Sequence, residues 1–498
     1  MKLDFNKYYD KVYACWIGKN IGGTMGTPYE GGRHLNDIKG FVTEANVVLP
    51  NDDLDLQLIW LYAMEQNGPE AINSAMLGEH WISFISPHWN EYGIGKANMK
   101  RGIRPPMSGD YVNDWNNSNG AWIRTEIWAC TAPGLPYVAA KNAVADASVD
   151  HGAGEGTYAA AFVCAMQSAA FVISDLRKCI EIGLSAIPER SRMAKSIRLV
   201  LKLYDEKKTW VEARNTILET NSDIGDGWFE APSNVSYAVI GLLWGEGDFK
   251  KSMITAINCG DDTDCTGATV GATLGILNGT SAIPEDWRAH IGDSIITVSV
   301  NKGNNGKFVP KTCKELTDRV VALAPVVFYH NNTKLIFVNP FAVKNQATIA
   351  FGEEDIPEDV YDILLKYTKD QIGRLTDSLV PNSLYFENFM IEAQLVLDKA
   401  PEAIPGENIG IHLSLNNKVT FEDEPRNVNL RWILPEGFTV SGKKTAMLRG
   451  FNPHSHGEAE VDFVLTVPEK VESTNRIILE ISNVGGFTPL YANFVLLG

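Results

Sequence analysis

Hydrophobic and polar positions follow two different periods along this 498-residue chain, and the change comes near residue 325. Before that point, apolar residues recur every three or four positions over stretches longer than a typical strand, for example in 157–173, 190–204 and 267–277. Such spacing is typical of α-helices. Residues 1–325 are therefore predicted to form an all-α domain.

Beyond that point the apolar period is two. Alternate positions are apolar along 461–467, and the segment 427–433 is also strand-like, with turn residues between such segments. We therefore expect residues 326–498 to form an all-β, Ig-like sandwich that supplies no catalytic group. The turn-rich stretch that contains His454 and His456 is interpreted as a loop and not as a metal site.

Composition excludes several classes of protein. Hydrophobic residues make up 45% of the chain and charged residues 21%, which is ordinary for a globular protein. The 44 Lys and Arg residues against 61 Asp and Glu give a net charge of −17. A surface of this sign repels phosphate backbones and anionic lipids, so we expect neither nucleic acid nor a membrane as a partner. The oligomeric state is left open.

Cysteine usage and the N-terminus bear on the compartment. The seven cysteines are an odd number without close pairs, which favours buried, reduced thiols over disulfides or a zinc site. No stretch approaches the length of a membrane-spanning helix, and the first residues lack the apolar run of a secretory signal. The sequence as written is expected to be cytoplasmic, or periplasmic or secreted if a leader has been removed.

Carboxylates gather at two predicted helix starts, 51–57 and 258–266. One acidic helix start is explained by capping and by the helix dipole. Two such starts in one helical domain can meet at a single point, where the carboxylates would repel one another unless cations neutralised them. Oxygen ligands of this kind suit Mg²⁺, Mn²⁺ or Ca²⁺ better than zinc.

Four short motifs, in this order, resemble those of the ADP-ribosylglycohydrolase family, the relatives of dinitrogenase-reductase-activating glycohydrolase. Residues 22–30 (GGTMGTPYE) are similar to the family's Gly-Asp-x-x-Gly-x-x-x-Glu, and residues 51–53 (NDD) resemble Thr-Asp-Asp. Residues 150–152 (DHG) stand where the family has Thr-His-Gly, and residues 260–265 (GDDTDC) resemble Gly-Gly-Asp-x-Asp-Thr. The match extends over about residues 8–300.

The resemblance implies an all-α fold with a divalent-metal site of one or two ions, Mg²⁺ first and Mn²⁺ or Ca²⁺ as alternatives. The implied metal-binding residues are Asn51, Asp52, Asp53, Asp262, Asp264, Cys265 and Thr266. Glu30 is the implied general acid or base, with Asp53 or Asp55 as its competitors.

Three departures from the family motifs leave the number of metal ions open. Asn51 and Cys265 stand where the family has threonines, and Gly23 replaces an aspartate. Asn51 still offers a carbonyl oxygen, whereas the sulfur of Cys265 is a poor ligand for Mg²⁺. Thr266 is the alternative source of the missing hydroxyl.

Two segments carry the candidate substrate contacts. The long polar loop 108–120 contains Asn113, Asp114 and Trp115, whose amide, carboxylate and indole suit a neutral sugar. The glycine-rich helix start after residue 150 could cradle a phosphate, but its flanking carboxylates would oppose a diphosphate. The candidates in this second segment and beside the first acidic motif are Asp55, Asp150, His151, Gly152 and Glu155.

The function expected from these features is metal-dependent hydrolysis of a glycosidic bond in a small neutral carbohydrate glycoside. One alternative is a hydrolase of mono-ADP-ribosylated protein or of a related ADP-ribosyl ester or nucleoside. The other alternative is a metal- and sugar-binding protein without catalytic activity, because three motif positions are changed.

Overall fold

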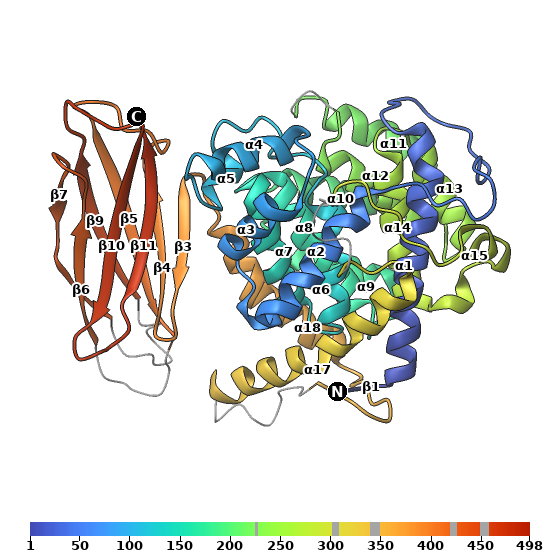
Figure 1. Cartoon of the computed structure of the whole chain (residues 1–498). Helices are drawn as coiled ribbons and strands as arrows, with labels where there is room; N and C mark the ends of the chain where they lie inside the picture. The colour runs from blue at the N-terminus through green and yellow to red at the C-terminus, as the bar shows by residue number, and fades with distance from the viewer. Residues whose placement is uncertain (225–227, 301–307, 339–348, 419–425, 449–457) are drawn as a thin grey trace.

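The structure is a computed structural model that describes residues 1–224, 228–300, 308–338, 349–418, 426–448 and 458–498 (Figure 1). The loop expected around His454 and His456 lies outside these residues. The first part of the chain forms a helical domain and the last part forms antiparallel sheets, which confirms the predicted fold class. The two parts lie side by side in Figure 1.

The long first helix, α1 (Phe5–Gly26), packs antiparallel against α14 (Thr263–Asn278). Glycines at every fourth position form the contact: a Cβ on Gly18 would lie 2.2 Å from the carbonyl oxygen of Gly271, and one on Gly22 would lie 2.1 Å from that of Gly267. The two backbones can approach so closely only because these positions lack side chains. The end of α1 is thereby placed beside the start of α14.

The other helices of this part surround this pair; most contribute to one hydrophobic core, and Met107 of α5 packs instead in the core of the sheets. They are α2 (Asp52–Asn67), α3 (Ser74–Phe84), α4 (Asn90–Lys100), α5 (Met107–Asp110), α6 (Glu126–Thr131), α7 (Pro136–His151), α8 (Glu155–Ala169), α9 (Leu176–Ser185), α10 (Arg192–Asp205), α11 (Trp210–Thr220), α12 (Ala231–Trp244), α13 (Phe249–Asn258), α15 (Glu285–Ile291), α17 (Cys313–Val338), α18 (Val360–Thr368) and α19 (Arg374–Asp377). The stretches 157–173, 190–204 and 267–277 fall largely in α8, α10 and α14, as their periodicity predicted.

The helical domain continues beyond the expected boundary at 325/326. Pro325 lies inside α17 and does not end it. After α17, β2 (Ala350–Phe351) pairs in parallel with β1 (Lys2–Leu3), and α18 packs on α7 and α9. Leu379 still belongs to the helical core, so the all-β part begins only with the strand at Ser383. The boundary was placed too early because local periodicity does not show which core a later helix joins.

Two antiparallel sheets enclose the second core. One has the order β11-β10-β6-β8 and the other β3-β4-β5-β9-β7. Their strands are β3 (Ser383–Glu387), β4 (Ile391–Leu397), β5 (Asn408–Asn417), β6 (Arg426–Ile433), β7 (Thr439–Gly442), β8 (Thr445–Leu448), β9 (Glu458–Thr466), β10 (Thr474–Asn483) and β11 (Leu490–Leu497). Inward residues alternate along them, and Leu413 of β5 faces Val461 of β9 in the register.

All seven cysteines are buried and free, as their apolar surroundings predicted. In the part of the chain that the structure describes, no helix combines the length and the apolar character needed to cross a bilayer.

Asp110, at the end of α5, gives a test of the packing of this helix on the turn between α7 and α8, where its Oδ1 accepts the amide of Ala153 at 2.7 Å. Burial raises the pKa of this carboxyl to about 7, against about 3.9 in an unfolded chain. A raised folded pKa means that its stabilising contribution is present below pH 4 and is lost as the pH rises through 7. We expect the free energy of unfolding to fall between pH 5 and pH 8 by about 2–3 kcal/mol more in the wild type than in Asp110→Asn.

Urea titrations at both pH values measure this difference, with exposed Asp114→Asn as the control. Equal pH dependence in wild type and Asp110→Asn would contradict the assigned burial.

Candidate active site

The end of α1 and the starts of α2 and α14 bring the acidic motifs together. Glu30 directly follows the 3₁₀ turn Thr27–Tyr29 at the end of α1. Asn51 caps α2 by accepting the amide of Asp53 at 2.7 Å, and Asp262 is the N-cap residue of α14. The convergence expected from two acidic helix starts is therefore present, and it follows from the close pairing of α1 with α14.

Two groups of potential ligand atoms share Asp264. One oxygen each of Glu30, Asp262 and Asp264 lie within 4.8 Å of one another. The same limit holds for one oxygen each of Asp53 and Asp264 and the sulfur of Cys265. We refer to Glu30, Asp52, Asp53, Asp262 and Asp264 as the acidic cluster.

The donor set fits a hard divalent cation. Oδ2 of Asp53 and Oδ1 of both Asp262 and Asp264 are buried and accept no hydrogen bond from the described residues. Buried carboxylate oxygens normally have a donor, and leaving them without one costs free energy. A divalent cation would supply such a partner, and oxygen donors are the ligands that Mg²⁺, Mn²⁺ and Ca²⁺ prefer.

Burial and mutual repulsion raise the pKa values in the cluster. The charge of Asp264, followed by burial, raises the pKa of Glu30 to about 8. Burial and then Asp264 raise the pKa of Asp52 to about 6, although the hydroxyl of Tyr92 opposes the shift by donating to Oδ2 at 3.1 Å. Burial also raises the pKa of Asp262 well above its usual range. The side chains of the protein alone thus do not neutralise the carboxylates of the acidic cluster.

Three side chains outside the expected set hold the cluster. Lys19 is fully buried, with its Nζ 3.0 Å from Oε2 of Glu126 and 3.8 Å from Oδ2 of Asp53. Tyr92 donates to Asp52, as described above. Asn119 donates from Nδ2 to Oδ2 of Asp262 at 2.6 Å and accepts from the indole of Trp122 at 2.9 Å.

Sequence signals for two of these three residues exist. Lys19 is the one charged residue of the segment 12–26, and Asn119 stands near the end of the polar loop 108–120. Tyr92 gives no such signal, because only the packing of α4 brings it to Asp52.

The three expected ligands that are not carboxylates have other partners. The side-chain oxygen of Asn51 serves as a helix cap, and the thiol of Cys265 donates to Oδ1 of Asp53 at 3.2 Å. The hydroxyl of Thr266 bonds within α14, to the carbonyl of Thr263 at 3.2 Å. Gly23 and Asn51, two of the positions that differ from the family motifs, lie next to each other. A Cβ on Gly23 would lie 2.0 Å from Nδ2 of Asn51.

Two carboxylates expected to contact substrate are structural groups. Asp55 is buried, and its Oδ2 accepts the amides of Val298 and Ser299 at 2.5 Å each, which ties α2 to that segment. Glu155 accepts the amides of Arg192 and Met193 at 2.8 Å each and thereby caps α10.

Asp150, His151 and Gly152 are also part of the interior. Asp150 lies 2.7 Å from Arg124 and 2.9 Å from Nδ1 of His151. Although burial raises it, these two neighbours hold the pKa of Asp150 below its usual value. Gly152 ends α7 with a positive φ of 52°. The Gly-rich segment therefore presents no free acid to a ligand, contrary to the expectation from sequence.

The polar loop offers fewer contacts than expected. Asn113 is buried and donates to the carbonyls of Gly109 and Asp150 at 2.7 Å each, so it shapes the loop from within. Asp114 is exposed and Trp115 is half-buried, which leaves these two available to a ligand.

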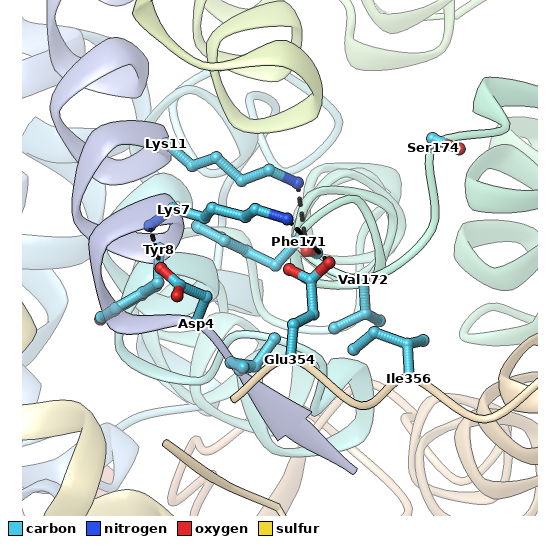
Figure 2. A pocket seen from close by; sticks show the side chains of 10 residues that line it. Asp4, Lys7, Tyr8, Lys11, Phe171, Val172, Ser174, Glu354 and Ile356 are labelled. Carbon is cyan, nitrogen blue, oxygen red and sulfur yellow. Dashed lines mark hydrogen bonds and ion pairs between the residues drawn. The ribbon is translucent and has the colours of Figure 1, made fainter. Parts of the chain in front are cut away.

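A cavity of about 300 Å³ lies elsewhere (Figure 2). Its walls include Lys7 and Lys11 of α1, Phe171, and Glu354, which pairs with Lys7 at 2.9 Å. Lys11 and the end of α1 are fifteen residues apart, or about 22 Å at the helical rise. This cavity is therefore at the opposite end of α1 from the acidic cluster.

A comparison with family models agrees with the motif resemblance. The family model described as ADP-ribosylglycohydrolase matches residues 4–324. A comparison with curated proteins finds no match. A solved structure described as "ADP-ribosylglycohydrolase-related protein complex" is 18% identical, covers 64% of this chain and 99% of its own, and has a TM-score of 0.42. A FixG-related protein from Vibrio parahaemolyticus is 11% identical, covers 22% of this chain and 97% of its own, and has a TM-score of 0.19.

Proposed function

Because the chain belongs to the ADP-ribosylglycohydrolase family, we propose that it hydrolyses a glycosidic bond with the help of a divalent cation, Mg²⁺ first among the candidates. Family membership supports glycohydrolase-type hydrolysis in general. The proposal of a metal rests on one observation, the buried carboxylate oxygens of Asp53, Asp262 and Asp264 that accept no hydrogen bond from the described residues, although Nζ of Lys19 lies 3.8 Å from the one on Asp53.

The residues of the cluster divide into two roles. Asp52, Asp53, Asp262 and Asp264 would hold one or two cations. Such a cation lowers the pKa of a bound water and supplies positive charge. Glu30 is the exposed member of the cluster, so its carboxyl can reach a substrate oxygen and give or take a proton there.

A neutral glycoside is the proposed substrate. One exposed indole stacks on a side chain that contacts the cluster, and one half-buried indole lies four residues before another such side chain in the sequence. Trp89 is 49% exposed and stacks on Tyr92, which donates to Asp52, and Trp115 belongs to the loop that ends at Asn119. Such rings suit the apolar face of a sugar.

One observation favours an ADP-ribosyl substrate as the second candidate. Arg33 lies near the start of α14, where its charge lowers the pKa of Asp261, although burial raises that pKa overall. Nε of Arg33 is buried and has no hydrogen-bond partner in the described part of the chain. A guanidinium beside a helix start could bind a phosphate. Asp150 and Glu155 do not oppose it, because both are engaged inside the protein.

We expect calorimetric titration to detect binding of at least one of Mg²⁺, Mn²⁺ and Ca²⁺ to the wild type. Binding should be lost in the double variant Asp262→Ala, Asp264→Ala, because Asp264 belongs to both groups of ligand atoms. Asp286→Ala, which removes an exposed carboxylate, is the matched control. Unchanged binding in the double variant would place the cation elsewhere.

The substrate is tested by assaying nitrophenyl glycosides beside ADP-ribosyl-arginine and ADP-ribosyl-serine, each with and without EDTA. Faster turnover of a sugar glycoside, abolished by EDTA, is the expected result. Faster turnover of an ADP-ribosyl compound would replace the first proposal by the second. Cation binding without turnover of any of these compounds would favour a binding protein.

A further inference from the structure

The core of the β-sandwich contains side chains from the helical domain. Ile103 and Met107 are each 1% exposed and Tyr111 is 8% exposed, and all three pack with the inward residues of the sheets. The hydroxyl of Tyr111 donates to Oε1 of Glu402 at 2.6 Å. In Figure 1, α5 lies at the side of the helical domain that faces the sandwich. The segment around α5 therefore completes the core of the other domain.

Polar contacts fix the same segment to the sandwich. Nη1 of Arg104 donates to Oδ1 of Asn493 at 2.6 Å, and its guanidinium lies 4.8 Å from the ring centre of Phe386. A Cβ on Gly102, whose φ is +95°, would lie 3.1 Å from a methyl carbon of Val495. We call the contacts of residues 102–111 with the sandwich the seam.

The chain runs from the seam directly to the acidic cluster. Asn98 donates to the carbonyls of Ser108 and Tyr111 at 2.9 and 2.7 Å, which fixes the exit of the segment. Farther on, the hydroxyl of Ser118 lies 3.1 Å from Nε2 of His151. The next residue, Asn119, donates to Asp262. Asn119, which donates to a carboxylate of the acidic cluster, thus follows Tyr111, which lies in the sandwich core, by eight positions in the sequence.

We propose that the sandwich is a working part of the candidate active site: by holding residues 102–111 it sets the position of the loop 113–119, and through Asn119 the orientation of the Asp262 carboxylate. Tyr111 and Arg104 are positioning residues, since neither contacts the cluster in the described structure. The proposal rests on the proposed function of that cluster. It differs from the expectation of a sandwich that is separate from the catalytic machinery.

The proposal has a reciprocal consequence. If holding the seam favours the cation-binding arrangement of Asp262, then a cation at the cluster must favour the intact seam by the same factor. Couplings of this kind commonly change affinity by about 5-fold or more. An attached domain without coupling would show neither effect.

The test uses the full-length protein and the double variant Tyr111→Phe, Arg104→Met, which keeps the apolar packing and removes both polar contacts. Arg431→Gln is the control, because it removes an exposed ion pair with Glu480 on the sandwich away from these contacts. We expect faster amide hydrogen exchange of residues 113–120 in the double variant, about 5-fold or more weaker Mg²⁺ binding, and unchanged exchange in α8. Arg104→Lys in place of Arg104→Met keeps a donor for Asn493, and it should restore most of the affinity for Mg²⁺.

In the wild type, Mg²⁺ should slow exchange at residues 401–404 and 490–495 of the sandwich. The proposal would be overturned if residues 113–120 showed equal amide hydrogen exchange in the double variant and in the control. It would also be overturned if Mg²⁺ bound without changing the exchange of the sandwich segments. A wild type that binds no divalent cation would instead refute the proposed metal, and the exchange comparison without cation would still decide the role of the seam.

Discussion

Glu30→Gln should lower the rate of hydrolysis by about 10²–10⁴-fold, the usual cost of losing a general acid or base. Glu30 is the one exposed carboxyl among the described members of the acidic cluster, and the charge of Asp264 raises its pKa to about 8 in the protein alone. A group with a pKa near the working pH can both hold and release a proton. Glutamine keeps the shape of the side chain and loses this ability.

The measurement is kcat on the substrate that the assays identify, together with the dissociation constant of Mg²⁺. We expect kcat to fall and cation binding to persist, since Asp52, Asp53, Asp262 and Asp264 remain. Glu219→Gln, an exposed change on α11, serves as the control and should leave kcat unaltered. A Glu30→Gln enzyme of normal rate would transfer the proton-carrying role to Asp53.

Lys19→Met should destabilise the protein by about 3–5 kcal/mol, as is typical when one partner of a buried ion pair is removed. Burial alone would lower the pKa of Lys19, but the carboxylates of Glu126 and Asp53 raise it above its usual value. Its stabilising contribution is thus fully present at pH 7 and would be lost only as the pH rises beyond 10.5. Methionine fills the space and leaves two buried carboxylates without their cation.

Urea unfolding at pH 7 measures this loss. Lys250→Met, which breaks an exposed pair with Asp286, should cost only about 0–1 kcal/mol and is the control. Adding Glu126→Gln to Lys19→Met should recover part of the stability, because the uncompensated charge is then gone. A loss below about 1 kcal/mol for Lys19→Met would mean that the pocket admits water to the carboxylates.

Local signals in the sequence were sufficient for the elements and for the meeting of the acidic motifs. Periodicity located α8, α10 and α14, because a helix face repeats over many residues of one segment. The carboxylates of 51–57 and 258–266 marked two helix starts, since capping is a contact between near neighbours in sequence. The family motifs then indicated which of these residues belong together.

The roles of single polar residues depended on packing at long sequence separation. Asp55 bonds residues 298–299, Asp150 bonds Arg124, and Glu155 bonds the start of α10. In sequence, each resembles a carboxylate available to a ligand. Only the fold supplies the partner that removes it from the candidate site.

The sequence by itself determined the fold class and the family, because these follow from periods and motifs within short segments, and its motifs led us to expect that two acidic helix starts meet. Tertiary structure decided where the helical domain ends, that Lys19 and Asn119 hold the acidic cluster, and that α5 belongs to the core of the sandwich. The reason is physical: hydrogen bonding between residues 40 to 389 positions apart is set by packing, and the local pattern of hydrophobic and polar residues carries no record of such partners.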